Sequence, residues 1–131
     1  MPIRVPKSDG RLTQTNRLRS RVARLPGMDE RTWDIVGQLV QWLNGSSTLP
    51  AETERLLRVM KLSEEVGETT QAIIGVLGQN PRKGVTHTWQ DVEAELCDVI
   101  LTAMVALTTF NSDARKVFAE RLEHVAARSL G

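Results

Sequence analysis

Apolar side chains recur every three or four residues in four separate segments of this 131-residue chain. This spacing places them on one side of an α-helix, whereas no segment alternates with a period of two for long enough to predict a strand. We expect helices from Asp29 to about Asn44, from Ala51 to about Leu77, from Thr88 to Phe110, and from Asn111 or Ser112 onward. Four helices joined by short connections predict an all-α protein, a four-helix bundle.

The expected helix ends carry residues that start or stop helices. Asp29 and Thr88 are typical N-cap residues. Gly78 stands where a helix would end in a left-handed residue, and the segment 45–50 combines Gly, Ser, Thr and Pro. In the last helix, the apolar residues that we expect to face inward are Val117, Phe118, Leu122 and Val125.

Positive charge gathers at the start of the chain. Residues 1–24 hold seven basic residues and one acidic residue, a net charge of +6, whereas the rest holds ten basic and fifteen acidic residues, a net charge of −5. The leader lacks a helical apolar pattern, so we divide the chain into a basic, disordered leader at 1–28 and a helical domain at 29–131. A solvated leader is the simpler interpretation, and contact with nucleic acid is the less favoured one.

Cys97 is the single cysteine, which excludes an intramolecular disulfide and makes a reducing cytoplasm the expected location. Its neighbours in the helical pattern favour a small buried residue over a nucleophile. No stretch is apolar enough to span a bilayer, so we expect no membrane contact. A domain of this size has a modest core, which favours oligomerisation.

Five carboxylates lie in two short blocks within the second and third expected helices: Glu64, Glu65, Glu68, Glu95 and Asp98. Positions three and four apart share a face of a helix, so each block points roughly one way. Apolar residues surround both blocks, and acids on an apolar face are costly unless positive charge compensates them. Lys61 can reach the first block, but no basic residue lies within four positions of the second. A divalent cation would supply the missing charge.

Magnesium is the cation that suits these ligands, because it prefers hard oxygen atoms in octahedral geometry. A calcium-binding EF-hand would need closely spaced acids in a glycine-containing loop, which the chain lacks. A di-iron bundle would need Glu-x-x-His pairs, and neither His87 nor His124 stands in such a pair. The spacing alone does not distinguish a metal site from a solvated acidic face.

The run Lys-Leu-Ser-Glu-Glu-Val-Gly-Glu at 61–68, followed by Glu-Leu-Cys-Asp-Val-Ile at 95–100, resembles the MazG-like all-α nucleoside triphosphate pyrophosphatases. That superfamily is marked by Glu-Glu-x-x-Glu and, after a variable insert, Glu-x-x-Asp. The resemblance covers about residues 30–128 and leaves the basic leader outside. It implies a helical bundle that assembles as a homodimer or a dimer of dimers. It also implies Mg²⁺-dependent hydrolysis of a nucleoside triphosphate to the monophosphate and pyrophosphate, with Mn²⁺ as a substitute, in nucleotide-pool house-cleaning.

Carried over by position, the resemblance makes Glu65, Glu68, Glu95 and Asp98 ligands of the main metal. Glu64 would serve an additional metal or orient the attacking water, so Glu64 and Glu65 are the catalytic candidates. Substrate contacts are expected from Lys61, from Arg82 and Lys83 in a loop that could close over phosphates, and from Trp42 beside the nucleoside. The loop could also be a plain connection, and the tryptophans could be core or interface anchors.

Two other functions stay open at this point. A MazG-like chain with weak catalysis could act as a nucleotide-binding or partner-binding helical module. A polyanion-binding protein could use residues 1–24, in which case binding would depend steeply on salt. The presence of all five acids favours the enzyme.

Overall fold

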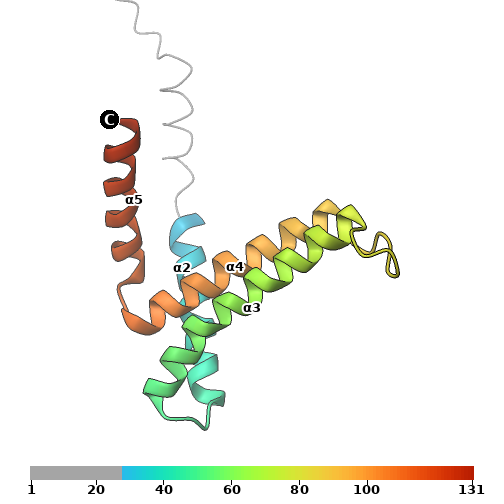
Figure 1. The fold of residues 1–131 in the computed structure, drawn as a ribbon. Helices are drawn as coiled ribbons and strands as arrows, with labels where there is room; N and C mark the ends of the chain where they lie inside the picture. Colours follow the sequence, from blue (N-terminus) through green and yellow to red (C-terminus); the bar gives the residue numbers. More distant parts are fainter. Residues whose placement is uncertain (1–27) are drawn as a thin grey trace, which may run out of the picture. The chain divides into compact units, whose positions relative to one another are not determined.

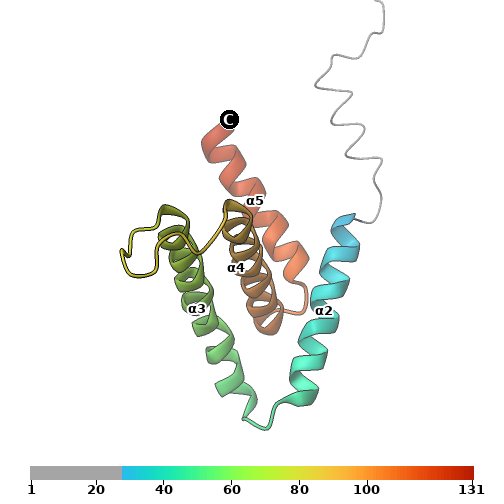
Figure 2. The same ribbon diagram turned by 90° about the vertical axis from the view of Figure 1, so that its right-hand side faces the viewer.

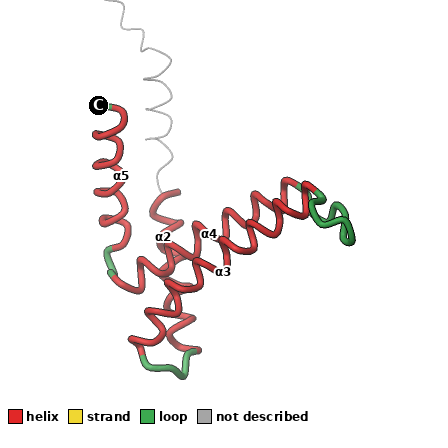
Figure 3. Tube along the Cα trace, viewed as in Figure 1, coloured by secondary structure: helices red, strands yellow, loops and turns green. Residues whose placement is uncertain are grey.

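The computed structural model describes residues 28–131, and the regular structure in this range is entirely helical (Figure 3). The helices are α2 at Met28–Ser46, α3 at Ala51–Leu77, α4 at Trp89–Phe110 and α5 at Ala114–Leu130 (Figure 1). The prediction of an all-α protein with four helices is therefore confirmed for the described residues. Trp33–Gly131 forms one compact unit. Apart from Met28, where α2 begins, the basic leader predicted at 1–28 lies outside the described residues.

Two of the predicted helix ends have the expected chemistry. Thr88 caps α4 in a capping box: its hydroxyl accepts from the Asp91 backbone N–H, and the Asp91 carboxylate accepts from the Thr88 N–H at 2.8 Å. The Thr88 N–H and the Thr88 hydroxyl both donate to the Asp91 carboxylate, and these two bonds lower the pKa of Asp91 below its ordinary value. At the end of α3, Gly78 has φ 60° and ψ 33°, and its N–H donates to the Ile74 carbonyl. A left-handed residue there lets the chain leave the helix with its last carbonyl groups bonded.

Two predicted caps were wrong. Asp29 lies inside the first turn of α2 rather than before it. The N-cap position of α5 is Asp113, not Asn111 or Ser112. The Asn111 side-chain oxygen instead accepts from the Asp113 N–H at 2.9 Å, which bends the chain between α4 and α5. An Asx turn of this kind uses the same side chain that would otherwise cap the helix.

The antiparallel helices α3 and α4 lie side by side along much of their length (Figure 2). Their buried positions are mostly occupied by small side chains, among them Thr69 and Ala72 on α3 and Ala106 on α4. Small side chains allow two helix backbones to approach closely. On α2, Val36 and Val40 are buried, and the Trp33 ring lies 6.0 Å from the Phe118 ring of α5.

The loop between α3 and α4 folds back onto α3 at Gly75. The Thr86 N–H donates to the Gly75 carbonyl at 3.0 Å, and the Thr86 hydroxyl is 2.8 Å from His87 Nδ1. A Cβ atom at Gly75 would overlap the imidazole ring of His87. Glycine at this position therefore lets the returning loop lie directly against the helix.

Few large side chains are fully buried in the described part of the chain. Phe118 and Leu122, predicted to face inward, are 51% and 56% exposed, although the Phe118 ring does contact Trp33. Val117 and Val125 are half-buried. Cys97, predicted to be buried, is exposed on α4. The periodic pattern identified apolar helix faces, but residues 28–131 do not bury all of them.

No helix among residues 28–131 combines the length and the apolar character needed to cross a membrane.

We predict that Gly75→Ala lowers the free energy of unfolding by about 1–3 kcal/mol, because the added methyl group displaces His87 and strains a packed contact. Gly37→Ala is the matched control: nothing lies within 4 Å of a Cβ there. That control should raise stability by roughly 0.5–1 kcal/mol, since alanine favours a helix interior. Urea unfolding followed by circular dichroism measures both effects. Equal stabilities for the two variants would contradict the packing of the loop against α3.

Candidate metal centre

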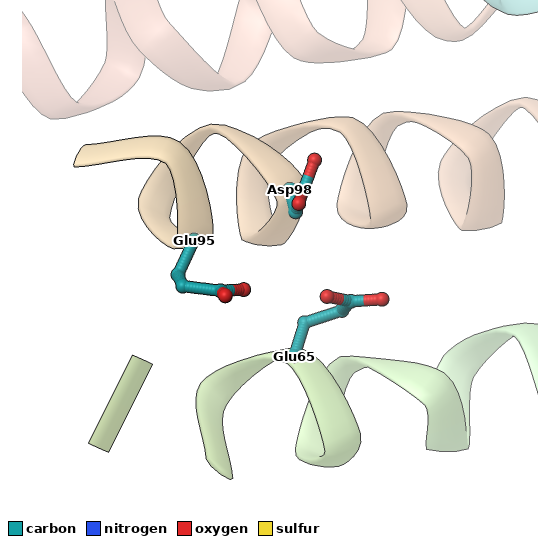
Figure 4. A group of neighbouring side chains, drawn as sticks. All are labelled: Glu65, Glu95 and Asp98. Carbon is teal, nitrogen blue, oxygen red and sulfur yellow. The ribbon is translucent and has the colours of Figure 1, made fainter. Parts of the chain in front are cut away.

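Three carboxylates meet where α3 and α4 face each other. Glu65 extends from α3 toward Glu95 on α4, and Asp98 lies one turn further along α4 (Figure 4). One oxygen atom from each of the three side chains lies within 4.8 Å of the other two. The two acidic blocks are separated by 26 intervening residues, and the antiparallel pairing of the helices brings them together.

Burial differs strongly among the three side chains. The Glu65 side chain is only 10% exposed, Glu95 is half-buried and Asp98 is exposed. The group therefore opens to solvent on the Asp98 side and is closed on the Glu65 side. A buried carboxylate needs a compensating charge. Glu65 has one, because the Lys61 ammonium lies 3.0 Å from its Oε1.

Lys61 also binds Glu64, with its Nζ 3.3 Å from Glu64 Oε2. The hydrogen bonds to Glu65 and Glu64 raise the pKa of Lys61 above its ordinary value of 10.5. The Glu64 side chain itself is 62% exposed. Glu64 therefore lies at the solvent edge of the group rather than among the three converging carboxylates. Lys61 neutralises one charge, which leaves an excess of negative charge around Glu65.

This excess of negative charge affects the pKa of Glu68. The negative charge of Glu65 raises the pKa of Glu68 above its ordinary value of 4.5, and desolvation and the Glu95 charge add to the effect. Glu68 lies on the exposed side of α3, outside the group of three. A raised carboxyl pKa next to other negative charges is the usual condition of carboxylates that share one site. A cation placed among them would reverse the shift.

The donor set fits magnesium. Oxygen ligands bound at about 2.1 Å in an octahedron lie no more than about 4.2 Å apart. One oxygen atom each of Glu65, Glu95 and Asp98 lies within 4.8 Å of the other two, which is close to this limit. All the ligands are hard oxygen atoms, and the solvent-facing side leaves room for water or phosphate in the coordination shell.

The two predicted substrate contacts in the loop lie away from this group. Arg82 and Lys83 belong to the loop after α3, and Lys83 lines a cavity of about 370 Å³ beside Gly75 and His87. At 1.5 Å per residue, the end of α3 at Leu77 is about 13 Å along the axis from Glu68. Trp42 is 66% exposed on α2 and lines none of the cavities described here.

The sequence interpretation missed Arg58, a buried cation near the acidic group. Its side chain is 7% exposed and lines a cavity of about 300 Å³ together with Lys61. Arg58 precedes Lys61 by three residues and Glu65 by seven, which places all three on one side of α3. Its position on this side of α3 follows from spacing, but its burial is seen only in the structure.

No protein-family model, curated protein or solved structure matches the chain. The resemblance to the MazG-like superfamily therefore rests on the two acidic motifs and on an all-helical chain.

We predict that Glu68→Gln raises the thermal midpoint of the protein in buffer free of divalent cations, because it removes a repelled charge. A raised folded-state pKa means that the native chain holds this proton more tightly than the unfolded chain. The stability of the wild type should therefore fall as pH rises from 4.5 through the folded-state pKa of Glu68. Glu68→Gln should flatten that fall.

Glu93→Gln is the control, because Glu93 is an exposed acid on α4 outside the cluster. Its thermal midpoint and pH dependence should match the wild type when measured by differential scanning fluorimetry with EDTA. A lower midpoint for Glu68→Gln than for this control would show that repulsion is absent.

Proposed function

We propose that this protein is a Mg²⁺-dependent nucleoside triphosphate pyrophosphohydrolase, which converts an NTP or dNTP to the monophosphate and pyrophosphate. The convergence of Glu65, Glu95 and Asp98 carries the proposal. These residues come from both acidic motifs and form one oxygen-rich, half-open group. A triphosphate is strongly anionic and would be repelled by such a group without a cation. The motif and the donor chemistry therefore support the same function.

The proposed roles of the acidic residues and Lys61 follow from how exposed each side chain is. Glu65, Glu95 and Asp98 would hold the cation from two helices, with Glu68 beside them. Mg²⁺, or Mn²⁺ in its place, would supply charge neutralisation for the phosphates and an acidified water. Glu64, which is exposed at the edge of the group, would orient that water, and Lys61 would contact a phosphate after leaving Glu65. Both roles need only side-chain movement.

We also propose that the chain works as a homo-oligomer, a four-helix MazG-like bundle in a dimer or a dimer of dimers. An exposed apolar stripe on α3 supports this assembly. The stripe is formed by Leu56 and Met60, which are four residues apart and are 63% and 65% exposed. Leu56 precedes Glu65 by nine residues, which is about 180° around the helix axis. The stripe therefore lies on the side of α3 opposite the buried carboxylate.

Helix α4 carries a second exposed stripe, formed by Trp89, Leu96 and Ile100 at 57%, 48% and 59% exposure. Contiguous apolar surface of this kind marks an interaction site. The partner that is always present at the same concentration is a second copy of the chain, and self-assembly usually forms closed symmetric dimers. Association would complete the modest core seen in the single chain.

A catalytically weak helical module that binds a nucleotide or another protein is the second candidate. The exposed stripes on α3 and α4 are the observation that favours it, because they offer a partner surface whether or not the acids catalyse. Turnover by the purified protein separates the two functions.

We predict that Asp98→Asn and Glu65→Gln each lower pyrophosphate release by at least about 100-fold, the usual cost of losing one electrostatic stabiliser of a transition state. Glu93→Gln should keep wild-type turnover. The assay is a panel of canonical, deoxy and oxidised triphosphates with Mg²⁺ or Mn²⁺, with circular dichroism as the folding check. Normal turnover by folded Asp98→Asn would show that the catalytic group lies elsewhere.

We predict that Met60→Glu shifts the protein toward the monomer, raising the dissociation constant at least about tenfold, because a charge would be buried at the interface. Gln90→Glu places the same charge at an exposed position on α4, off the stripe, and should leave assembly unchanged. Sedimentation velocity over a concentration series measures both. A wild-type protein that stays monomeric throughout would refute the proposed assembly.

A further inference from the structure

Arg58 is a buried cation whose hydrogen-bonding capacity is only partly used. Its Nη1 donates to Thr109 Oγ1 at 3.0 Å, and its Nε lies 3.5 Å from Glu54 Oε2. Both Nε and Nη2 are shielded from solvent and lack a hydrogen-bond partner in the described part of the chain. Burying two N–H groups of a charged side chain without hydrogen-bond acceptors costs free energy.

The two donors form one edge of the guanidinium group. Nε and Nη2 point the same way, so their N–H bonds are parallel and suit a ligand with two adjacent acceptors. The Glu54 carboxylate does not occupy this edge with good geometry, because it is 3.5 Å from Nε and is held by the Ser47 hydroxyl at 2.7 Å. The edge is therefore prepared for a further acceptor pair.

Arg58 lines a mainly apolar cavity of about 300 Å³ that adjoins the acidic group. The apolar walls come from three helices and include Leu43, Leu57, Leu101 and Val105. A volume near 300 Å³ is at the lower end of the range for small-molecule sites. Apolar walls beside the guanidinium group of Arg58 match the polarity of a heteroaromatic ring.

The cavity and the acidic group share a boundary. Lys61 lines the cavity and binds Glu65, and Thr102 lines it one turn after Asp98 on α4. A single ligand could therefore place an anionic end among the carboxylates, through a cation, and a ring against Arg58. This arrangement links the cavity to the hydrolytic function proposed above.

We infer that this cavity binds the nucleobase of the substrate and that the Nε–Nη2 edge of Arg58 selects bases with two adjacent acceptors. The inference rests on the proposed function. Guanine offers O6 and N7, and cytosine offers O2 and N3. Adenine and thymine place a donor beside each ring-edge acceptor, so they satisfy only one of the two N–H groups. Guanine and cytosine nucleotides are therefore the preferred class.

An anion is the main alternative ligand for the Nε–Nη2 edge of Arg58. Glu54, 3.5 Å from Nε, would repel a phosphate or carboxylate there, and the apolar walls would desolvate it. A neutral base has neither cost. Because both nitrogens are shielded, entry of the base requires side-chain movement, and the cavity residues Leu57, Lys61 and Leu101 are exposed enough to shift.

The test compares kcat/KM for dGTP, dCTP, dATP and dTTP in the wild type, Arg58→Lys and Arg58→Met. Arg58→Lys keeps the charge beside Glu54 but loses the two parallel donors. Both variants should lose roughly 5- to 150-fold for dGTP or dCTP, mainly through KM, and should change little for dATP and dTTP. Arg55→Lys is the control, because Arg55 stacks on Phe110 and lies outside this cavity.

Binding supplies a readout without turnover. Titration calorimetry with GMP, CMP and AMP, in the presence of Mg²⁺, should show tighter binding of GMP or CMP that Arg58→Lys removes. Uniform loss across all four triphosphates would assign Arg58 a structural role and overturn the inference. Inorganic phosphate could instead displace the monophosphates, and bind with the same affinity to the wild type and to the apolar-wall variant Leu101→Ala. That result would show that the Nε–Nη2 edge of Arg58 binds an anion. No turnover of any triphosphate by the wild type would refute the proposed function instead.

Discussion

The close approach of α3 and α4 is the constraint on which the candidate site depends. Buried positions on the two helices hold small side chains, among them Thr69, Ala72 and Ala106, which allow a close approach of the backbones. Glu65 can then be buried while still reaching Glu95 across the contact. Larger residues would hold the helices apart and separate the acidic motifs. The geometry of the candidate site thus depends directly on the packing of α3 against α4.

That arrangement carries an electrostatic cost. Lys61 neutralises part of the charge around Glu65, and the raised pKa of Glu68 shows that repulsion persists. Perturbed pKa values of this kind cluster at functional sites. The same excess charge would give the protein affinity for a hard cation. The repulsion that would favour binding of a cation therefore also lowers the stability of the protein without the cation.

Much of the fold follows from local sequence rules. Helix positions, the Thr88 cap and the Gly78 terminus depend on residues close in the chain, and simple spacing identified them. The convergence of Glu65 with Glu95 followed from two motifs on neighbouring helices. Burial was predicted less well, because Phe118 and Cys97 depend on which faces are covered in three dimensions. Arg58 was missed because an isolated arginine carries no motif, and its unused donors are visible only once its neighbours are placed.

The contact between Gly75 and the returning loop has a consequence for the acidic group several turns away. The Thr86–Gly75 hydrogen bond and the Thr88 cap determine which residue begins α4 and at what height beside α3. A slip of one residue would move α4 by about 1.5 Å and rotate it by about 100°. Extra residues near Asn80 would only enlarge the tip of the loop. Extra residues between Thr86 and Thr88 would lengthen the chain between the Thr86–Gly75 hydrogen bond and the start of α4. They would therefore move Asp98 away from Glu65.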